Sequence, residues 1–393
     1  MPSIEKIPAM RAQVLTIMAT RAQDQQLVGS VAGQHGVQSR SDLAGARDPR
    51  QDTGKVVPAF GWHPWFSYQI YDDTLPSKDR TYDPGRADGG DDGLLQEKAR
   101  HLAAVLSPAP QDTEFATKMP ELVSLSSLLD QTRGFLRDHP LALVGEIGVD
   151  KAFRLPQPWH EDGTPLSRDE GLTPGGREGR LLSPHRVKMA HQASILKAQL
   201  KLAGEMGRAV SVHGVQAHGI LFDTCSACWK GHEKEVISKR QKKMVAPGAE
   251  DFSSSSSEDE EEESEGNIAK PRQASRPRQL DPKPYPPRVC LHSFSGPVEV
   301  LKQYMDPRIP AKVYFSFSLA VNFSTPASQE KTPAVIKACP PDRLLVESDL
   351  HVAGDQMDAA LEGMYRKVCA IKGWALEQGV QRIRQNYEAF IFG

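Results

Sequence analysis

Short apolar runs recur along the chain, and patterns typical of helices separate them. One apolar stripe with alternating spacings of four and three residues runs through Met189, Ala193, Leu196, Leu200 and Ala203. A strand followed by a helix, repeated many times, favours a parallel sheet. The expected strands are Val14 to Met18, Val56 to Trp62, Ala142 to Val149, Ala209 to His213, Val289 to His292, Val313 to Phe317 and Leu344 to Val346. These seven strands are one short of a closed barrel, so the sequence predicts an α/β fold of the TIM-type (β/α)8 class that lacks its first strand.

The size and charge of the chain are consistent with one large domain. It has 393 residues, and α/β barrels routinely use about 250 residues or more for a single core. Charged residues make up 25% of the chain, and the formal net charge is -2. This balance gives no global attraction to polyanions or membranes, so any binding of nucleic acid would have to be local. We expect residues 1–393 to form a single barrel domain with insertions.

Sequence signals for membranes and secretion are absent. No apolar stretch approaches the roughly 20 residues that cross a bilayer, and no basic segment followed by a hydrophobic signal core stands at the N-terminus. The five cysteines are an odd number in a long chain, which is typical of reduced intracellular thiols. The sequence therefore predicts a cytoplasmic or nuclear protein with no membrane partner and no structural disulfide.

Three polar segments are expected to interrupt the barrel. Residues 225–287 carry a basic run at 239–243, serines at 253–257 and an acidic run at 258–263. Such a composition cannot bury a core, so we predict a disordered low-complexity insertion between two strands. Residues 72–93 and 156–184 are rich in glycine, proline and polar residues, and we expect polar loop insertions there.

Side chains that bind divalent metals occur in or directly after several predicted strands. Glu146 lies within one apolar run, and His213, His292 and Asp349 lie at or near the ends of later runs. A parallel barrel brings the C-terminal ends of its strands to one face, so these side chains are expected to converge. Carboxylates and imidazoles are the ligands of hydrolytic divalent metals. The sequence therefore predicts one metal-binding mouth.

Several motifs resemble, in matching order, the TatD family of metal-dependent deoxyribonucleases. They are Gly61-Trp62-His63-Pro64, Gly145-Glu146-Ile147-Gly148-Val149-Asp150, Val212-His213, Leu291-His292-Ser293-Phe294-Ser295-Gly296 and Leu344-Leu345-Val346-Glu347-Ser348-Asp349. The C-terminal residues Asn386 to Gly393 are similar to the family's terminal asparagine helix, which closes on Phe-Gly. The long polar insertion also resembles fungal TatD-like proteins that are described as interactors of an anaphase-promoting-complex subunit. The resemblance implies hydrolysis of DNA phosphodiester bonds, with such a subunit as a partner to consider.

The resemblance also implies a set of metal ligands. In the family, two divalent ions are held by a His-x-His pair on the first strand, a bridging glutamate, two later histidines and a final aspartate. Here Glu146 would be the bridge, His213 and His292 would complete one metal site, and Asp349 would belong to the other. Glu146 and Asp349 are the expected catalytic residues. Such ligands accept zinc, manganese or magnesium, so the sequence does not select the ion.

Further residues are expected around these ligands. By the resemblance, His63 faces the substrate as a phosphate-positioning or proton-handling residue, and a histidine bonded within a turn is the alternative. Asp150 and Arg154 follow the bridging glutamate and are expected to bind substrate phosphates, with ion pairing of the loop as the alternative. Glu347 lies two residues before Asp349, on the same face of a strand. It is expected to orient ligands from behind or to complete a buried polar network.

The chain departs from the family pattern at its N-terminal end, where no His-x-His precedes the strand that starts at Val14. One hypothesis is that Met1 is an internal methionine of a longer natural chain, since losing a strand leaves an unpaired sheet edge. The rival hypothesis is a noncatalytic scaffold or interaction protein in cell-cycle regulation that keeps a weaker site for one metal ion. A third alternative is a metallohydrolase that cuts C–N bonds in a small molecule. A metal-dependent deoxyribonuclease, impaired by the absent ligands, is the main prediction.

Overall fold

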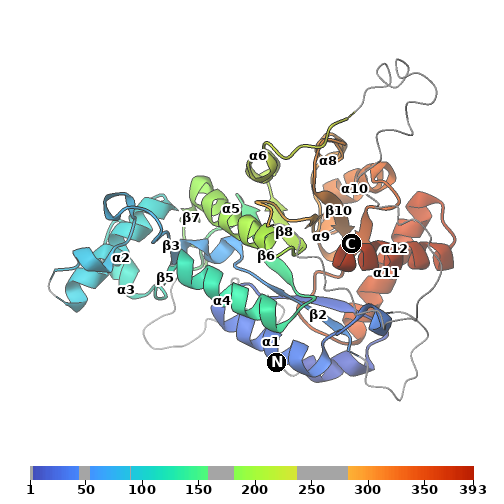
Figure 1. Cartoon of the computed structure of the whole chain (residues 1–393), viewed down its shortest axis with the longest axis horizontal. Coiled ribbons are helices and arrows are strands. Elements are labelled where there is room, and N and C mark those ends of the chain that lie inside the picture. The colour runs from blue at the N-terminus through green and yellow to red at the C-terminus, as the bar shows by residue number, and fades with distance from the viewer. Residues whose placement is uncertain (1–2, 44–53, 89, 158–180, 237–281) are drawn as a thin grey trace, which may run out of the picture.

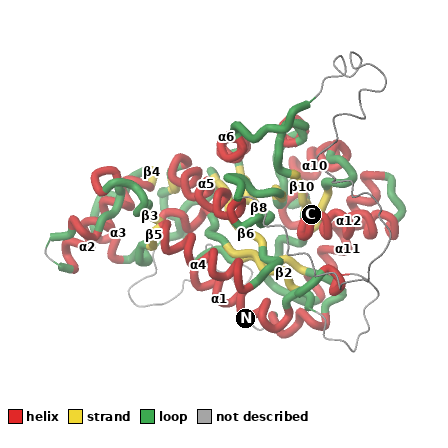
Figure 2. The backbone as a smooth tube through the Cα atoms, viewed as in Figure 1, coloured by secondary structure: helices red, strands yellow, loops and turns green. Residues whose placement is uncertain are grey.

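The computed structural model describes residues 3–43, 54–88, 90–157, 181–236 and 282–393. In these residues the main sheet has seven strands, all parallel, in the order β1-β2-β6-β8-β9-β10-β11. Figure 2 shows the strands in the interior, with helices around them. The strands are β1 Leu15–Met18, β2 Val56–Phe60, β6 Leu143–Asp150, β8 Val210–Val215, β9 Arg288–Leu291, β10 Lys312–Phe317 and β11 Leu344–Val346. Every strand that the sequence predicts is confirmed, with ends that differ by at most two residues.

Helices connect the strands and cover the sheet, as parallel connections require (Figure 1). The α-helices are α1 Ala22–His35, α2 Asp91–Val105, α3 Glu114–Thr117, α4 Leu125–Asp138, α5 Met189–Glu205, α6 His218–Trp229, α8 Val298–Tyr304, α9 Leu319–Asn322, α10 Pro326–Ala338, α11 Asp355–Lys372 and α12 Leu376–Phe392. The 3-10 helices are η1 Ile4–Ala9, η2 Arg40–Leu43, η3 Pro64–Gln69, η4 Ser77–Asp79 and η5 Pro84–Arg86. The predicted apolar stripe lies on α5, where Leu196, Leu200 and Ala203 are buried.

A smaller lobe extends from one side of the sheet and contains α2 and α3, at the left of Figure 1. Its strand pairs are β3 Ile70–Tyr71 with β5 Val123–Ser124, in parallel, and β4 Leu106–Ser107 with β7 Arg186–Val187, in antiparallel. A second hydrophobic cluster, which includes Trp62, Leu102 and Leu128, joins the lobe to the end of β2 and to α4. The lobe is therefore packed against the main sheet and its helices through shared buried side chains.

Local sequence signals explain where several helices begin and end. The α10 helix starts with a capping box in which the side chains of Thr325 and Ser328 bond to each other's backbone N–H groups. Pro326 stands at its first position, where no backbone N–H is needed. The α11 helix ends at Gly373, whose φ of 68° is a left-handed conformation that glycine adopts without strain.

The central strands are buried on both faces. On β10, Val313, Phe315 and Phe317 belong to the largest hydrophobic cluster, whereas Tyr314 belongs to a different cluster with Cys290. Successive side chains of a strand point to opposite faces, so both faces of β10 pack against apolar neighbours. This explains why the parallel strands read as continuous apolar runs instead of alternating ones.

The sheet remains open between its edge strands β1 and β11. Among the described residues no pairing joins these strands, which fits a TIM-type barrel with one strand fewer. Helices hold this side together. The backbone N–H groups of Arg11 and Ala12 donate to the carboxylate of Asp358 on α11 over 2.7 and 3.0 Å. Thr16 of β1 shares a 2.8 Å hydrogen bond with Tyr387 of α12.

The boundaries predicted for the long insertion were wrong at both ends. Cys225 and Cys228 are buried in α6, and Tyr285 is buried in the main core just before β9. The apolar side chains of α6 continue through Trp229, so the polar composition begins later than position 225. Residues 237–281, which include the basic and acidic runs, lie outside the described residues.

The two shorter insertions are also partly folded. In the segment 72–93, Asp83 is buried and its backbone N–H donates to Glu97 of α2 over 3.0 Å. In the segment 156–184, Pro156 and Leu182 form an isolated bridge, and residues 158–180 lie outside the described residues. The first of these segments is therefore packed against α2 and is not a free loop.

Two further features concern the cysteines and the length of the apolar helices. All five cysteines are buried and free. Within the described ranges, no helix is both long enough and apolar enough to cross a bilayer.

A buried histidine in the smaller lobe predicts loss of stability in acid. Nε2 of His101 is 2.9 Å from the Tyr68 carbonyl oxygen, and Nδ1 is 2.8 Å from the Thr81 hydroxyl. Burial and the neighbouring ring of His191 lower the pKa of His101 to about 4. The unfolded chain, with a histidine pKa of about 6.5, binds this proton first as the pH falls. The stability contributed by neutral His101 is thus present above pH 6.5 and is lost as the pH falls toward 4.

We expect this one group to remove up to about 3 kcal/mol of the free energy of unfolding across that pH range. His101→Gln keeps a donor for Tyr68 but cannot titrate, so its stability should depend less on pH. Urea unfolding of both proteins at pH 7 and pH 5 measures the difference. Equal losses in the two proteins would show that His101 does not carry this pH dependence.

Candidate metal centre

Three of the predicted metal-binding side chains meet within or directly after neighbouring parallel strands. Glu146 lies on β6, His213 on β8 and His292 directly after β9. His63 follows β2 and precedes η3. These side chains come from strands that are neighbours in the sheet order β2-β6-β8-β9, so parallel pairing alone brings them together.

One carboxylate oxygen lies at the centre of the group. Oε1 of Glu146 is 2.9 Å from Nε2 of His63, 3.1 Å from Nδ1 of His213 and 3.0 Å from Nε2 of His292. Nδ1 of His213 and Nε2 of His292 are 3.3 Å apart. All four side chains are at most 14% exposed. We call these four residues the carboxylate–imidazole cluster.

Mutual charge interactions keep Glu146 ionised inside the protein. Burial alone would raise the pKa of its carboxyl, but His63, His292 and His213 hold that pKa well below its usual range. Burial acts to lower the pKa of His292, yet Glu146 outweighs it and raises that pKa to about 10. By contrast, burial lowers the pKa of His63. The pKa values of His213 and His292 are thus raised, whereas that of His63 is lowered.

Asp150 fixes the orientation of His213. Its Oδ2 lies 3.1 Å from Nε2 of His213, on the side of the ring away from Glu146. The indole N–H of Trp65 donates to it over 2.7 Å, and the backbone N–H groups of Ala152 and Phe153 donate over 2.8 and 2.9 Å. Burial acts to raise the pKa of Asp150, but His213 and these donors lower it to about 2.

This arrangement differs from the substrate contact that the sequence predicted for Asp150. The residue is 5% exposed, and both of its carboxylate oxygens accept hydrogen bonds from within the protein. A carboxylate behind a histidine ligand sets which ring nitrogen carries the proton. With Nε2–H donated to Asp150, Nδ1 is the His213 nitrogen that faces Glu146.

A second group of possible ligands adjoins the cluster. One ligand atom each of His292, Glu347 and Asp349 lie within 4.8 Å of one another. The hydroxyls of Ser293 and Ser316 donate to Glu347, which fits the supporting role predicted for it, and burial raises its pKa. Asp349 is exposed, and its Oδ2 lies 3.3 Å from the hydroxyl oxygen of Ser293. Asp349 is thus the member of this group that faces solvent.

His63 lies deeper than the sequence predicted. It is 2% exposed, and its ring packs edge-on against Trp65 at 4.7 Å and against His213 at 4.5 Å between ring centroids. Together with Glu146 and His213 it forms a group whose geometry could hold a metal ion. The sequence signal missed here is Trp65, two residues after His63, which contacts both the histidine and Asp150.

The remaining predicted residue, Arg154, is not part of the cluster. It lies half-buried in the loop after β6. Within the described part of the chain, no hydrogen bond or ion pair links it to the ligands.

The donor set fits one divalent ion. Imidazole nitrogens and a carboxylate oxygen suit zinc and manganese, and the carboxylates also suit magnesium. Glu146, His213 and His292 converge on one point, and Nδ1 of buried His292 has no hydrogen-bond partner among the described residues. A second ion would have to use Glu347 and Asp349 and share His292. The residues described therefore supply one full set of ligands and part of another.

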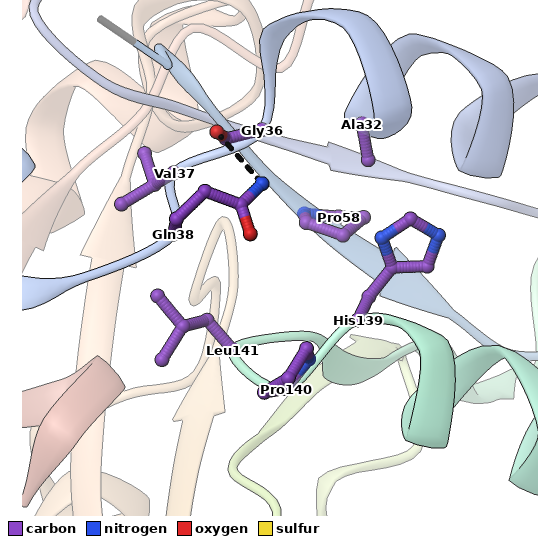
Figure 3. Close-up of a pocket in the computed structure, with 8 residues that line it drawn as sticks. All are labelled: Ala32, Gly36, Val37, Gln38, Pro58, His139, Pro140 and Leu141. Carbon is purple, nitrogen blue, oxygen red and sulfur yellow. Dashed lines mark hydrogen bonds between the residues drawn. The ribbon is translucent and has the colours of Figure 1, made fainter.

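The pocket in Figure 3 is a separate feature. It is lined by Ala32, Gly36, Val37, Gln38, Pro58, His139, Pro140 and Leu141, and shares no residue with the cluster. Gly36 pairs with the first residue of β2, and Leu141 precedes β6, so the pocket lies toward the N-terminal ends of these strands. Side chains at that end of a parallel barrel generally serve stability.

Comparison with known proteins identifies the family. The family model described as TatD related DNase matches residues 15–392. The chain belongs to this family. The Cut9-interacting protein scn1 of Schizosaccharomyces pombe is 33% identical over 380 residues, which are 96% of this chain and 91% of that protein. The predicted family and its fungal branch are confirmed.

Two further similarities are more distant. A protein of Saccharomyces cerevisiae named as an uncharacterized deoxyribonuclease is 22% identical over 360 residues, 89% of this chain and 85% of that protein. The crystal structure of the TatD homolog YjjV from Escherichia coli aligns with 99% of this chain and 90% of its own, with a TM-score of 0.44 and 14% identity.

The contact between Asp150 and His213 predicts an effect on metal affinity. Asp150→Asn keeps the size of the side chain but replaces the charged acceptor of the His213 N–H, so the favoured ring tautomer is lost. We expect divalent metal to bind about 10- to 100-fold more weakly, as is usual when a carboxylate behind a histidine ligand is removed. Calorimetric titration with zinc or manganese measures this.

Asp306→Asn is the matched control, since Asp306 pairs with Arg308 before β10, at the other end of the sheet. Unchanged affinity in Asp150→Asn would contradict a role for this carboxylate in holding His213.

Proposed function

We propose that this chain is a metal-dependent hydrolase that cuts phosphodiester bonds in DNA. The observation that carries the proposal is the convergence of His63, His213 and His292 on one buried oxygen of Glu146 at the C-terminal ends of parallel strands. Enzymes with this type of barrel hold their catalytic groups at that face. Membership of a family named for DNase activity supports DNA as the substrate.

The residues take distinct roles in this proposal. Glu146, His213 and His292 would hold a divalent ion, and the exposed carboxylate of Asp349 beside them would contribute to a second ion or receive a proton. A bound divalent ion polarises a phosphate ester and makes water more acidic. Asp150 and Glu347 orient the ligands through the hydrogen bonds described above.

The substrate side of the proposal rests on the loop after β6. Arg154 and the exposed Lys151 follow Glu146 along the chain, and positive side chains of this kind bind phosphates without selecting a base sequence. We also propose that the protein is located in the nucleus or the cytoplasm.

A role in binding another protein is the second candidate. It is favoured by the relative named as a Cut9-interacting protein, with which this chain shares 33% identity over 96% of its length. In that case a Cut9-like protein is the partner, and binding would not depend on Glu146. Co-purification of such a protein with both the wild type and a Glu146 variant would support this role.

Glu146→Gln tests the enzymatic proposal. The amide has the same shape but no negative charge, so three imidazoles would surround a neutral group and attract a cation far less. We expect metal binding and cleavage of end-labelled DNA to fall by more than about 100-fold, because direct ligands contribute more than the residues behind them. Metal content by mass spectrometry and oligonucleotide cleavage measure the two effects.

Asp306→Asn serves again as the control that should retain wild-type behaviour. A wild-type protein that binds no divalent metal and leaves single- and double-stranded DNA intact would refute the enzymatic proposal.

A further inference from the structure

We infer that His63 is a positioning residue, which donates a hydrogen bond to Glu146, and is not a ligand of the metal. This inference rests on the proposed function, because it concerns the same centre. His63 lies as close to Glu146 as the other two histidines do. Distance alone therefore does not separate a ligand from a donor, and the distinction depends on which ring nitrogen carries a proton.

The backbone settles the proton position on His63. The backbone N–H of Trp65 lies 3.2 Å from Nδ1 of His63, and a backbone N–H can only donate. Nδ1 must therefore accept, with its lone pair directed at Trp65. An imidazole ring carries at least one N–H, so on His63 the proton is at Nε2. That N–H points at Oε1 of Glu146 over 2.9 Å.

A nitrogen that carries a proton cannot bind a metal, because a ligand must offer its lone pair. To act as a ligand through Nε2, His63 would have to move its proton to Nδ1 and break the bond from Trp65. His213 is arranged differently, since its Nε2 faces the Asp150 carboxylate and its Nδ1 faces Glu146, so loss of the Nδ1 proton leaves the bond to Asp150 intact. Two similar rings on the same carboxylate oxygen thus differ in which nitrogen can be free of a proton.

The surroundings hold the ring of His63 in the orientation in which Nδ1 accepts from Trp65 and Nε2 donates to Glu146. Its side chain caps η3, with Pro64 at the first helical position, so the ring is joined to the start of that helix. Its backbone N–H donates to the Thr20 carbonyl over 2.9 Å. The preceding residue, Trp62, both donates to and accepts from the side-chain amide of Gln199. Ring and backbone are therefore held from both sides.

The charge of the His63 side chain affects how strongly Glu146 attracts a cation. A neutral donor holds the Glu146 oxygen in place without cancelling its negative charge, so the charge remains available to a cation. A positively charged donor at the same place would compete with the cation for it. His63 is thus suited to fix the carboxylate before and after an ion binds.

Three substitutions at His63 separate a donor from a ligand. Gln places an amide N–H near the position of Nε2, Asn places one near the position of Nδ1, and Leu has neither. We expect His63→Gln to bind Co²⁺ within about threefold of wild type, and His63→Leu and His63→Asn to bind about 10- to 100-fold more weakly. The visible spectrum of bound Co²⁺ should be unchanged in all three, since the ligand set is the same.

His213→Gln is the comparison for loss of a true ligand and should change that spectrum. A spectral change of the same kind in His63→Gln, or affinity as weak as that of His63→Leu, would show that His63 is a ligand and overturn the inference. Thermal unfolding of each metal-free variant identifies any that fail to fold, and His63→Gln, which retains the donor, is the variant expected to fold normally.

A second readout needs no metal. Nitrogen-15 correlation spectra of the histidine rings report which nitrogen is protonated, and the signal missing from His63→Gln identifies His63. We expect the Nε2–H form in the metal-free wild type. The Nδ1–H form would overturn the inference even if the protein bound metal, whereas a wild type without metal affinity would refute the proposed function alone.

Discussion

The buried negative charge of Glu146 is the constraint on which the centre depends. A carboxylate taken out of water costs several kcal/mol unless opposite charges or donors surround it. His63, His213 and His292 fill that requirement, each with a ring nitrogen within 3.1 Å of the same oxygen. The arrangement that stabilises the carboxylate also brings the ring nitrogens of His213 and His292 to one point. The same contacts therefore stabilise the buried carboxylate and prepare a site for a cation.

Close backbone approach makes that convergence possible. A Cβ atom at Gly148 would lie 2.0 Å from the carbonyl oxygen of His213, and one at Gly61 would lie 2.7 Å from the side chain of Ile147. Glycine at these positions lets β6 lie tightly between its neighbours. The pairing of β6 with β8 is also irregular beside Glu146, and such irregularities redirect side chains. The glycines of the two sequence motifs thus serve the geometry of the centre without contributing a ligand.

The sequence predicts the sheet and much of the centre because both follow from the alignment of parallel strands. Apolar runs locate the strands, and the strand ends then bring Glu146, His213 and His292 together without further information. The direction of His63 is different, because its ring is set by a backbone N–H in η3, and no residue pattern encodes the path of that turn. Asp150 is similar, since its burial depends on the Trp65 indole reaching it from another connection. The sequence alone does not predict such contacts between loops.

The two ligand groups differ in their balance of charge. Around Glu146 one carboxylate faces several imidazoles, so the metal-free cluster is already compensated. In the neighbouring group, Glu347 and Asp349 share a single imidazole, His292, which also serves Glu146. Two carboxylates so close to each other repel, and hydroxyl donors to Glu347 offset only part of that repulsion. The excess negative charge lies on the exposed side, at Asp349, so a cation approaching from solvent meets Asp349 before it reaches the buried imidazoles.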